Sequence, residues 1–313
     1  MSAGGDAGDQ VDGRGQDDRR ENVCEQAVLQ YDGPDLAGGH ARVRHLEGHA
    51  EVVAEVEEVA VRRLVVFGVE VDPTLRVAVV EVHRGPSNFF DEELLRELAE
   101  AVQAADEQPD VRCVVLCSEG KHFCAGADLR EATPAGIRRI YRHAFGLFTG
   151  RRPIVAAVQG AAIGGGLGLA LAADFRVARP DARFSANFAR LGFHHGFGLS
   201  VTLPAVVGRQ HALELLYTGR VVSGTEAREI GLCDRLAEGD LREAALGLAA
   251  EIAGSAPLSL SAIRATMRRR LVADVSAALD AEAEAQSALL GTADFTEGIS
   301  ASIERRTPVF TGA

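Results

Sequence analysis

The amino-acid sequence predicts an α/β protein, and three observations support this fold class. Short apolar runs rich in β-branched residues alternate with helical patterns along most of the chain, which is typical of strand-then-helix units. From about Ala256 onward the pattern is helical alone. A hydrophobic content of 47% in 313 residues is enough for a substantial core. We therefore expect an α/β core followed by a helical C-terminal part.

The individual elements follow from local patterns. LVVFGVEV and RVAVVEVH are strand-like runs separated by the turn residues Asp72, Pro73 and Thr74, so they predict a hairpin. Apolar residues on one face predict an amphipathic helix over residues 92–106. The other predicted strands cover residues 111–118, 154–158, 175–178 and 182–188. The other predicted helices cover residues 167–173, 199–207, 210–217, 224–230, 241–253, 257–271 and 275–290.

The segment from Pro153 to Asp174 joins a strand, a glycine-rich turn and a helical run, with no charged residue inside it. Gly164, Gly165 and Gly166 have no Cβ atom, so a ligand can approach their backbone N–H groups closely. The first N–H groups of a helix also have no partner within the helix. This arrangement favours bound negative charge.

Three other interpretations of the same segment are a tight structural turn, a membrane span and a dinucleotide-binding fingerprint. The uncharged run has the length of a span, about 20 residues, but it contains five glycines and Gln159. The fingerprint G-x-G-x-x-G fails at its last position, which is Leu171. The structural turn is the strongest of the three alternatives.

Composition limits the classes of partner. The net charge of -12 argues against nucleic acid, whose binding needs clustered Lys and Arg. The five cysteines are odd in number and lack C-x-x-C spacing, so we expect neither a disulfide framework nor a metal site. No signal-peptide pattern is found, and we expect a soluble cytoplasmic protein without a membrane partner. Residues 1–22 are rich in Gly and Asp, which predicts disorder.

Two loops together resemble a known family. Phe123-Cys124-Ala125-Gly126-Ala127-Asp128-Leu129, followed by Gly160-x-x-Ile163-Gly164-Gly165-Gly166, resembles the paired oxyanion-hole segments of the enoyl-CoA hydratase/isomerase, or crotonase, superfamily. The likeness covers roughly residues 65–313. It implies a crotonase-like spiral of repeated ββα turns over residues 65–255, after an N-terminal extension over residues 1–64. It also implies a helical oligomerisation region over residues 256–313 and a homotrimer or hexamer.

The resemblance also implies a site. Its ligand would be an acyl-CoA thioester, with coenzyme A as part of the substrate and no separate cofactor. The backbone N–H groups of Ala127 and Gly165 would hold the oxygen of a thioester enolate. Asp128 ends the first loop, where it could also cap the next helix. The implied substrate-contacting residues are Ala125, Gly126, Asp128, Gly164, Gly166, Phe188 and Arg264. Arg264 is also compatible with a solvated helix face shared with residues 268–270.

The sequence departs from the family pattern at the catalytic acids. The usual hydratases have two glutamates, at positions that align here with Gly168 and Phe188. Neither residue can transfer a proton, so the two-carboxylate hydration mechanism is not expected. His195 aligns near a catalytic Asp of the naphthoate synthases, and His195, or its neighbour His194, is a candidate acid or base. The alternative is that both are structural loop histidines.

These departures leave several functions open. One is lyase, hydratase or isomerase chemistry that uses His195. Another is hydrolysis, decarboxylation or carbon–carbon cleavage of an acyl-CoA, which needs fewer side-chain acids. A third is an acyl-CoA-binding subunit without activity.

Overall fold

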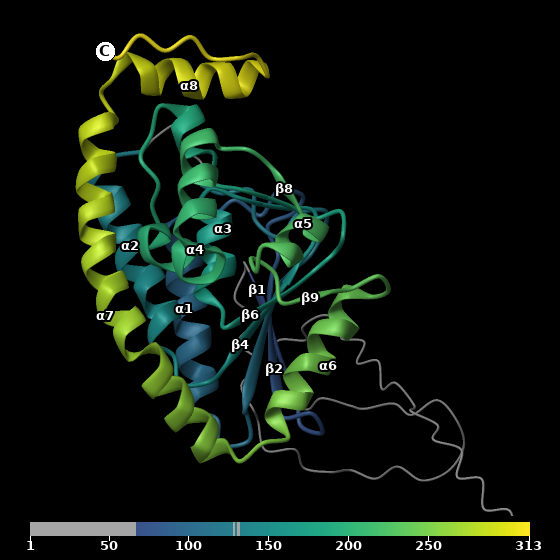
Figure 1. Ribbon diagram of the computed structural model, residues 1–313. Coiled ribbons are helices and arrows are strands. Elements are labelled where there is room, and N and C mark those ends of the chain that lie inside the picture. The colour runs from purple at the N-terminus through teal and green to yellow at the C-terminus, as the bar shows by residue number, and fades with distance from the viewer. Residues whose placement is uncertain (1–66, 128, 130–131) are drawn as a thin grey trace, which may run out of the picture. The chain divides into compact units, whose positions relative to one another are not determined.

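A computed structural model of the protein describes residues 67–127, 129 and 132–313. The predicted extension over residues 1–64 and the candidate Asp128 lie outside the described residues. The predicted α/β class is confirmed, since the described chain folds as units of one or two strands followed by a helix, and ends in two further helices (Figure 1).

The larger sheet has six strands in the order β1-β2-β3-β4-β6-β9. Its first two strands form the predicted antiparallel hairpin, and the Asp72 carboxylate closes the turn by accepting hydrogen bonds from the N–H groups of Thr74 and Leu75, at 2.9 and 2.8 Å. The remaining strands join in parallel. The strand bounds are β1 Phe67–Asp72, β2 Val77–Val82, β3 Cys113–Ser118, β4 Ile154–Val158, β6 Phe175–Ala178 and β9 Arg235–Leu236.

A smaller sheet is formed by short strands that alternate along the chain with strands of the larger sheet. It contains β5 (Ala161–Ile163), β7 (Arg183–Ser185) and β8 (Val222–Ser223), with β5 and β7 parallel. Single bridges between Cys124 and Ala162, and between Phe90 and Ala127, extend the pairing to the loops after β3 and β2. The sequence did not predict β5, because three small or apolar residues after a glycine have no distinct strand pattern.

The helices are α1 Glu92–Glu107, α2 Pro134–Thr149, α3 Gly165–Ala172, α4 Leu199–Thr218, α5 Gly224–Glu229, α6 Leu241–Ala253, α7 Pro257–Leu289 and α8 Ala293–Glu304, with a 3-10 helix over Asn187–Leu191. Helices α1, α2 and α7 lie on one face of the larger sheet and α6 covers the other (Figure 1). None of the described helices is by itself long and apolar enough to cross a membrane, but the bent pair α6 and α7, at 102°, passes that test together.

Helix α8 was not predicted, and the bounds of α7 and α4 differ most from the prediction. Helix α7 is continuous where two helices were expected, because residues 272–274 include neither Gly nor Pro. Helix α4 runs through the expected gap with a kink at Gly208. Helix α2, for which no range was predicted, begins after Thr133, whose hydroxyl accepts a hydrogen bond from the Gly136 N–H.

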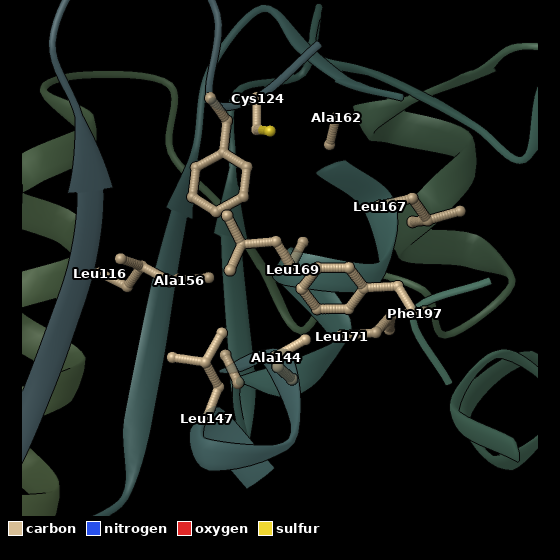
Figure 2. Close-up of a cluster of buried hydrophobic side chains, with 14 of the residues drawn as sticks. Leu116, Cys124, Ala144, Leu147, Ala156, Ala162, Leu167, Leu169, Leu171 and Phe197 are labelled. Atoms are coloured by element: carbon tan, nitrogen blue, oxygen red, sulfur yellow. The ribbon is translucent and has the colours of Figure 1, made fainter. Parts of the chain in front are cut away.

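Helix α3 is apolar on every side and lies inside the core. Its residues from Gly166 to Ala172 are all buried. Leu167, Leu169 and Leu171 share one apolar cluster with Leu116 and Phe197 (Figure 2). Because the helix is packed on all faces, its N-terminal residue is held in a fixed position.

Candidate active site

One cavity brings most of the predicted site residues together. It encloses about 600 Å³, part of which is open to solvent. Its lining includes the predicted residues Ala125, Gly126, Ala127, Gly164, Gly165 and Phe188. The other lining residues are Phe90, Leu129, Ile137, Ile140, Tyr141, Ile163, Asn187, Leu191, Phe193, Phe197 and Gln286.

The first loop is held in place by backbone hydrogen bonds on two sides. The Ala125 N–H donates to the Ser87 carbonyl at 2.9 Å, and the Gly126 carbonyl accepts from the Phe90 N–H at 2.9 Å. The Ala127 N–H, in contrast, donates to no described residue. A backbone donor is therefore available on this wall of the cavity.

The second loop presents another such donor. The Gly164 N–H donates to the Ser185 carbonyl at 2.8 Å, which fixes the turn between β5 and α3. Gly164 has φ 57° and ψ -119°, a conformation that disfavours any residue with a Cβ atom. Gly165 is the first residue of α3, and its N–H has no acceptor among the described residues. The positive end of the α3 dipole adds to the attraction for an anion here.

Gly166 supports the two loops from behind the cavity. It does not line the cavity, and a Cβ atom on it would lie 2.1 Å from the Cys124 carbonyl oxygen. A side chain at residue 166 would therefore push the loops apart. The structure places this predicted substrate contact in the packing between the loops.

The two positions where the family has glutamates contain no acid. A Cβ atom on Gly168 would lie 2.5 Å from the Phe197 Cβ, so Phe197 fills the space that a larger residue would need. Phe188 is 7% exposed and presents an apolar ring to the cavity. Neither position therefore offers a group that could transfer a proton, and both have apolar neighbours.

Three polar side chains line the described part of the cavity, and two of them bond to each other. The Tyr141 hydroxyl of α2 donates to Gln286 Oε1 of α7 at 2.7 Å, and Gln286 Nε2 donates to the His194 carbonyl at 2.8 Å. Burial raises the pKa of Tyr141, so it remains a neutral phenol. The third polar side chain is Asn187. No group of three His, Cys, Asp or Glu residues in the described chain could hold a metal ion.

Sequence analysis missed all three of these polar residues. Tyr141 and Gln286 belong to helices far apart in the chain and match no motif. A usable signal was the position of Gln286 on the buried face of α7, with Leu279 and Ala283. Asn187 directly precedes Phe188, a position that the family pattern had already singled out.

The structure does not place His195 on the cavity wall. Its ring stacks on that of His194, with centroids 4.0 Å apart, and its Nε2 lies 2.8 Å from Ser200 Oγ. Burial, together with the neighbouring His194, lowers the pKa of His195 to about 4. The residues on either side that do line the cavity are Phe193 and Phe197.

Arg264 lies in a buried ion cluster away from the cavity. Its Nε donates to Asp174 Oδ2 at 2.9 Å, and Arg268 donates to Asp174 Oδ1 at 2.7 Å. Burial alone would raise the pKa of Asp174, but the two arginines hold it below its usual value. Arg264 is 7% exposed, so it does not lie on the solvated helix face considered above. The geometry assigns Arg264 to this cluster and gives no support for a substrate contact.

Comparisons with known proteins agree on one family. The sequence model of the family Enoyl-CoA hydratase/isomerase matches residues 74–313. The putative enoyl-CoA hydratase/isomerase YngF of Bacillus subtilis strain 168 is 35% identical over 246 residues, which are 75% of this chain and 95% of that protein. The probable enoyl-CoA hydratase EchA14 of Mycobacterium tuberculosis is 41% identical over 58% of this chain and 73% of that protein.

Solved structures show the same fold. An enoyl-CoA hydratase/isomerase from Pseudoalteromonas atlantica T6c superposes with a TM-score of 0.71 at 30% identity, over 78% of this chain and 99% of that chain. An enoyl-CoA hydratase from Mycobacterium avium subsp. paratuberculosis K-10 gives a TM-score of 0.70 at 27% identity, over 78% of this chain and 98% of that chain.

Proposed function

The chain belongs to the enoyl-CoA hydratase/isomerase family, and from this premise we propose that it acts on an acyl-CoA thioester through the enolate of the acyl group. The observation that carries the proposal is the pair of N–H groups of Ala127 and Gly165. Both residues line one cavity, and neither N–H donates to a described residue. Two fixed donors of this kind suit an oxygen atom that gains negative charge.

The chemistry follows from the charge that develops. The described lining residues include no carboxylate or imidazole, so the base is solvent water or hydroxide. When the α-carbon of the thioester loses its proton to this base, the electron pair of the broken C–H bond moves into the carbonyl group and places negative charge on the thioester oxygen. Donors already oriented toward that oxygen need no reorganisation at the moment of reaction. In comparable sites one such donor contributes about 2.7–4 kcal/mol of transition-state stabilisation. The acyl group would lie against the apolar side chains of the cavity.

Hydration by paired glutamates is disfavoured as the mechanism. Gly168 packs against Phe197, and Phe188 presents a ring to the cavity. The described lining residues include no carboxylate. Isomerisation, hydrolysis, decarboxylation or carbon–carbon cleavage can use the same two N–H donors, and a subunit that only binds acyl-CoA is the second candidate function.

Other expectations from the family resemblance stay predictions. They are the division at residues 64 and 255, the homotrimer or hexamer, the cytoplasmic location and the absence of a cofactor besides coenzyme A.

The deciding experiment is solvent-deuterium exchange at the α-carbon of butyryl-CoA, measured by mass spectrometry with the full chain. Crotonyl-CoA hydration is followed in parallel through the loss of the conjugated thioester's ultraviolet absorbance. We expect exchange above the rate in buffer alone, which shows that the enolate forms. Hydration in addition would mean that some group other than the usual glutamates delivers water. Tight coenzyme A binding with neither reaction would favour the binding subunit.

A matched pair of variants isolates the Gly165 N–H. A Cβ atom at residue 165 would lie 2.4 Å from the Phe90 Cζ, so both variants are made with Phe90→Leu, which removes that ring atom. Gly165→Ala keeps the N–H, whereas Gly165→Pro removes it at a helix position that tolerates proline. We expect the proline variant to exchange about 100- to 1000-fold more slowly than the alanine variant. Equal rates would exclude this donor from the mechanism.

A further inference from the structure

Asn187 is the polar side chain of the cavity that has no evident structural task. Tyr141 and Gln286 use their hydrogen-bonding groups on each other and on the His194 carbonyl. The carboxamide of Asn187 donates to no described residue, although Asn187 lines the same cavity. Asn187 is partly buried, so its carboxamide is open to water or to a ligand in the cavity.

Strand register places Asn187 level with the proposed oxyanion donor. In the parallel pair β5 and β7, Ile163 lies opposite Ser185. Gly165 and Asn187 each come two residues after that pair, at the carboxyl ends of their strands. The Gly165 N–H and the Asn187 side chain therefore lie at the same edge of the smaller sheet, and both residues line the cavity.

Two glycines lie close to Asn187. A Cβ atom on Gly164 would lie 3.2 Å from Asn187 Oδ1, so the carboxamide lies beside the residue that precedes the donor. Behind it, a Cβ atom on Gly219 would lie 3.1 Å from the Asn187 Cα. The Ser185 hydroxyl donates to the Gly219 carbonyl at 3.0 Å and ties β7 to the end of α4. Asn187 thus lies between Gly164 of the second loop and Gly219 at the end of α4.

We propose that the Asn187 carboxamide is a third hydrogen-bond donor to the thioester oxygen, beside the N–H groups of Gly165 and Ala127. This inference rests on the proposed function. The carboxamide is neutral at all accessible pH values and cannot accept the α-proton, so it does not replace a missing glutamate. It lowers the energy of the enolate by donating an N–H toward the negative oxygen, as a side-chain donor can in an oxyanion hole.

The test compares Asn187→Leu and Asn187→Asp in the full chain. Leucine has a similar size and no hydrogen-bonding group, and aspartate is nearly isosteric but accepts only and is negatively charged. The α-deuterium exchange of butyryl-CoA gives kcat and KM for each, and urea unfolding reports stability. We expect N187L to lose about 100- to 1000-fold in kcat with KM within about threefold of the native chain. We expect N187D to be slower than N187L, because its charge repels the enolate.

Each other outcome contradicts a stated part of the inference. If N187L exchanges within about threefold of the native chain, or N187D is as fast as N187L or faster, Asn187 is not a donor to the enolate. The second result would instead mean that its oxygen accepts a bond from the substrate. If N187L is unfolded in buffer, Asn187→Ser, which has a short side chain, is compared with N187D under the same criterion. No exchange by the native chain overturns the proposed function together with this inference.

Discussion

His195 shows how one residue can be close to a site without being part of its surface. It follows the cavity residue Phe193 by two positions, yet its ring packs on His194 and its Nε2 lies near Ser200. A general base must reach the proton that it removes, either directly or through one water. The ring position therefore favours a structural role for His195 in holding the loop that presents Phe193 and Phe197.

A structural His195 predicts a specific dependence of stability on pH. Burial and His194 lower its pKa from 6.5 to about 4 in the folded chain. Between these values the unfolded chain binds a proton that the folded chain does not bind, so stability falls as pH falls. His195→Gln keeps a polar group near Ser200 but cannot titrate. By urea unfolding at pH 7.5 and 5.0, we expect the native chain to lose more free energy of unfolding than H195Q.

His195→Gln also tests whether His195 is a catalytic acid or base. If His195 were an acid or base, His195→Gln would reduce turnover by about 100-fold or more. We expect turnover in the deuterium-exchange assay to stay within about threefold of the native value. A large loss of turnover, with the pH dependence of stability unchanged, would contradict the structural role and return His195 to the mechanism.

At the scale of elements, α3 and the loop that contains Phe197 are matched in shape. Gly168 on α3 leaves room for Phe197, whose ring also meets that of Phe90 edge-on, with centroids 5.5 Å apart. The packing of Phe197 against Gly168 leaves no room for a glutamate at residue 168. Phe197 also forms part of the cavity wall. A residue without a side chain at position 168 and a large ring at position 197 are thus complementary in size.

Glycine-to-alanine changes in two helices test this fit. Gly168→Ala would place a methyl group 2.5 Å from the Phe197 Cβ, and we expect it to cost about 1–3 kcal/mol of unfolding free energy. Gly247→Ala in α6 is the control, because a Cβ atom there has no neighbour within 4 Å. That change should raise stability by up to about 1 kcal/mol. Urea unfolding measures both, and equal effects would mean that Phe197 moves aside without cost.

The sequence was sufficient for elements whose signals are local. The Asp72 turn, the periodicity of α1 and α6 and the apolar run of β4 all depend on nearby residues, and the structure has them within one or two positions of the prediction. Helix α7 was divided wrongly at residues 272–274, which contain no helix stop signal. β5 was missed since its pairing with β7, and not its composition, makes it a strand.

For the site, the loops were easier to locate from the sequence than the polar side chains of the cavity. Ala127 and Gly165 were chosen because their loops resemble the paired loops of the family, and both residues line one cavity. Their role as donors stays a prediction. Tyr141 and Gln286 meet only after α2 packs against α7, which no local pattern encodes. Arg264 was placed by analogy, and its buried pairing with Asp174 depends on tertiary contacts.

At the scale of the whole described chain, α7 connects the sheet, the cavity and α4. Its Gln286 lines the cavity, and the carboxylate of its buried Glu282 accepts hydrogen bonds from the N–H groups of Gly198 and Ser200 at the start of α4, at 2.7 and 2.8 Å. Near its other end, Arg264 and Arg268 pair with Asp174, which also accepts the N–H of Ile154 in β4 at 2.8 Å. Asp174 is therefore the link between α7 and the larger sheet.

This link predicts a large and pH-independent cost for Asp174→Asn near neutrality. Removing the charge leaves two mostly buried guanidinium groups without their counter-ion, which costs about 3–5 kcal/mol. Asp181→Asn is the control, because Asp181 is 83% exposed and should contribute less than about 1 kcal/mol.

The pKa of Asp174 is lowered, so its contribution to stability is present above the unfolded pKa of about 3.9 and is lost as pH falls through the folded pKa. Urea unfolding at pH 7.5 and 5.0 should therefore give the same difference between D174N and the native chain. A difference that disappears at pH 5.0 would mean that Asp174 is not held as a carboxylate by the arginines of α7.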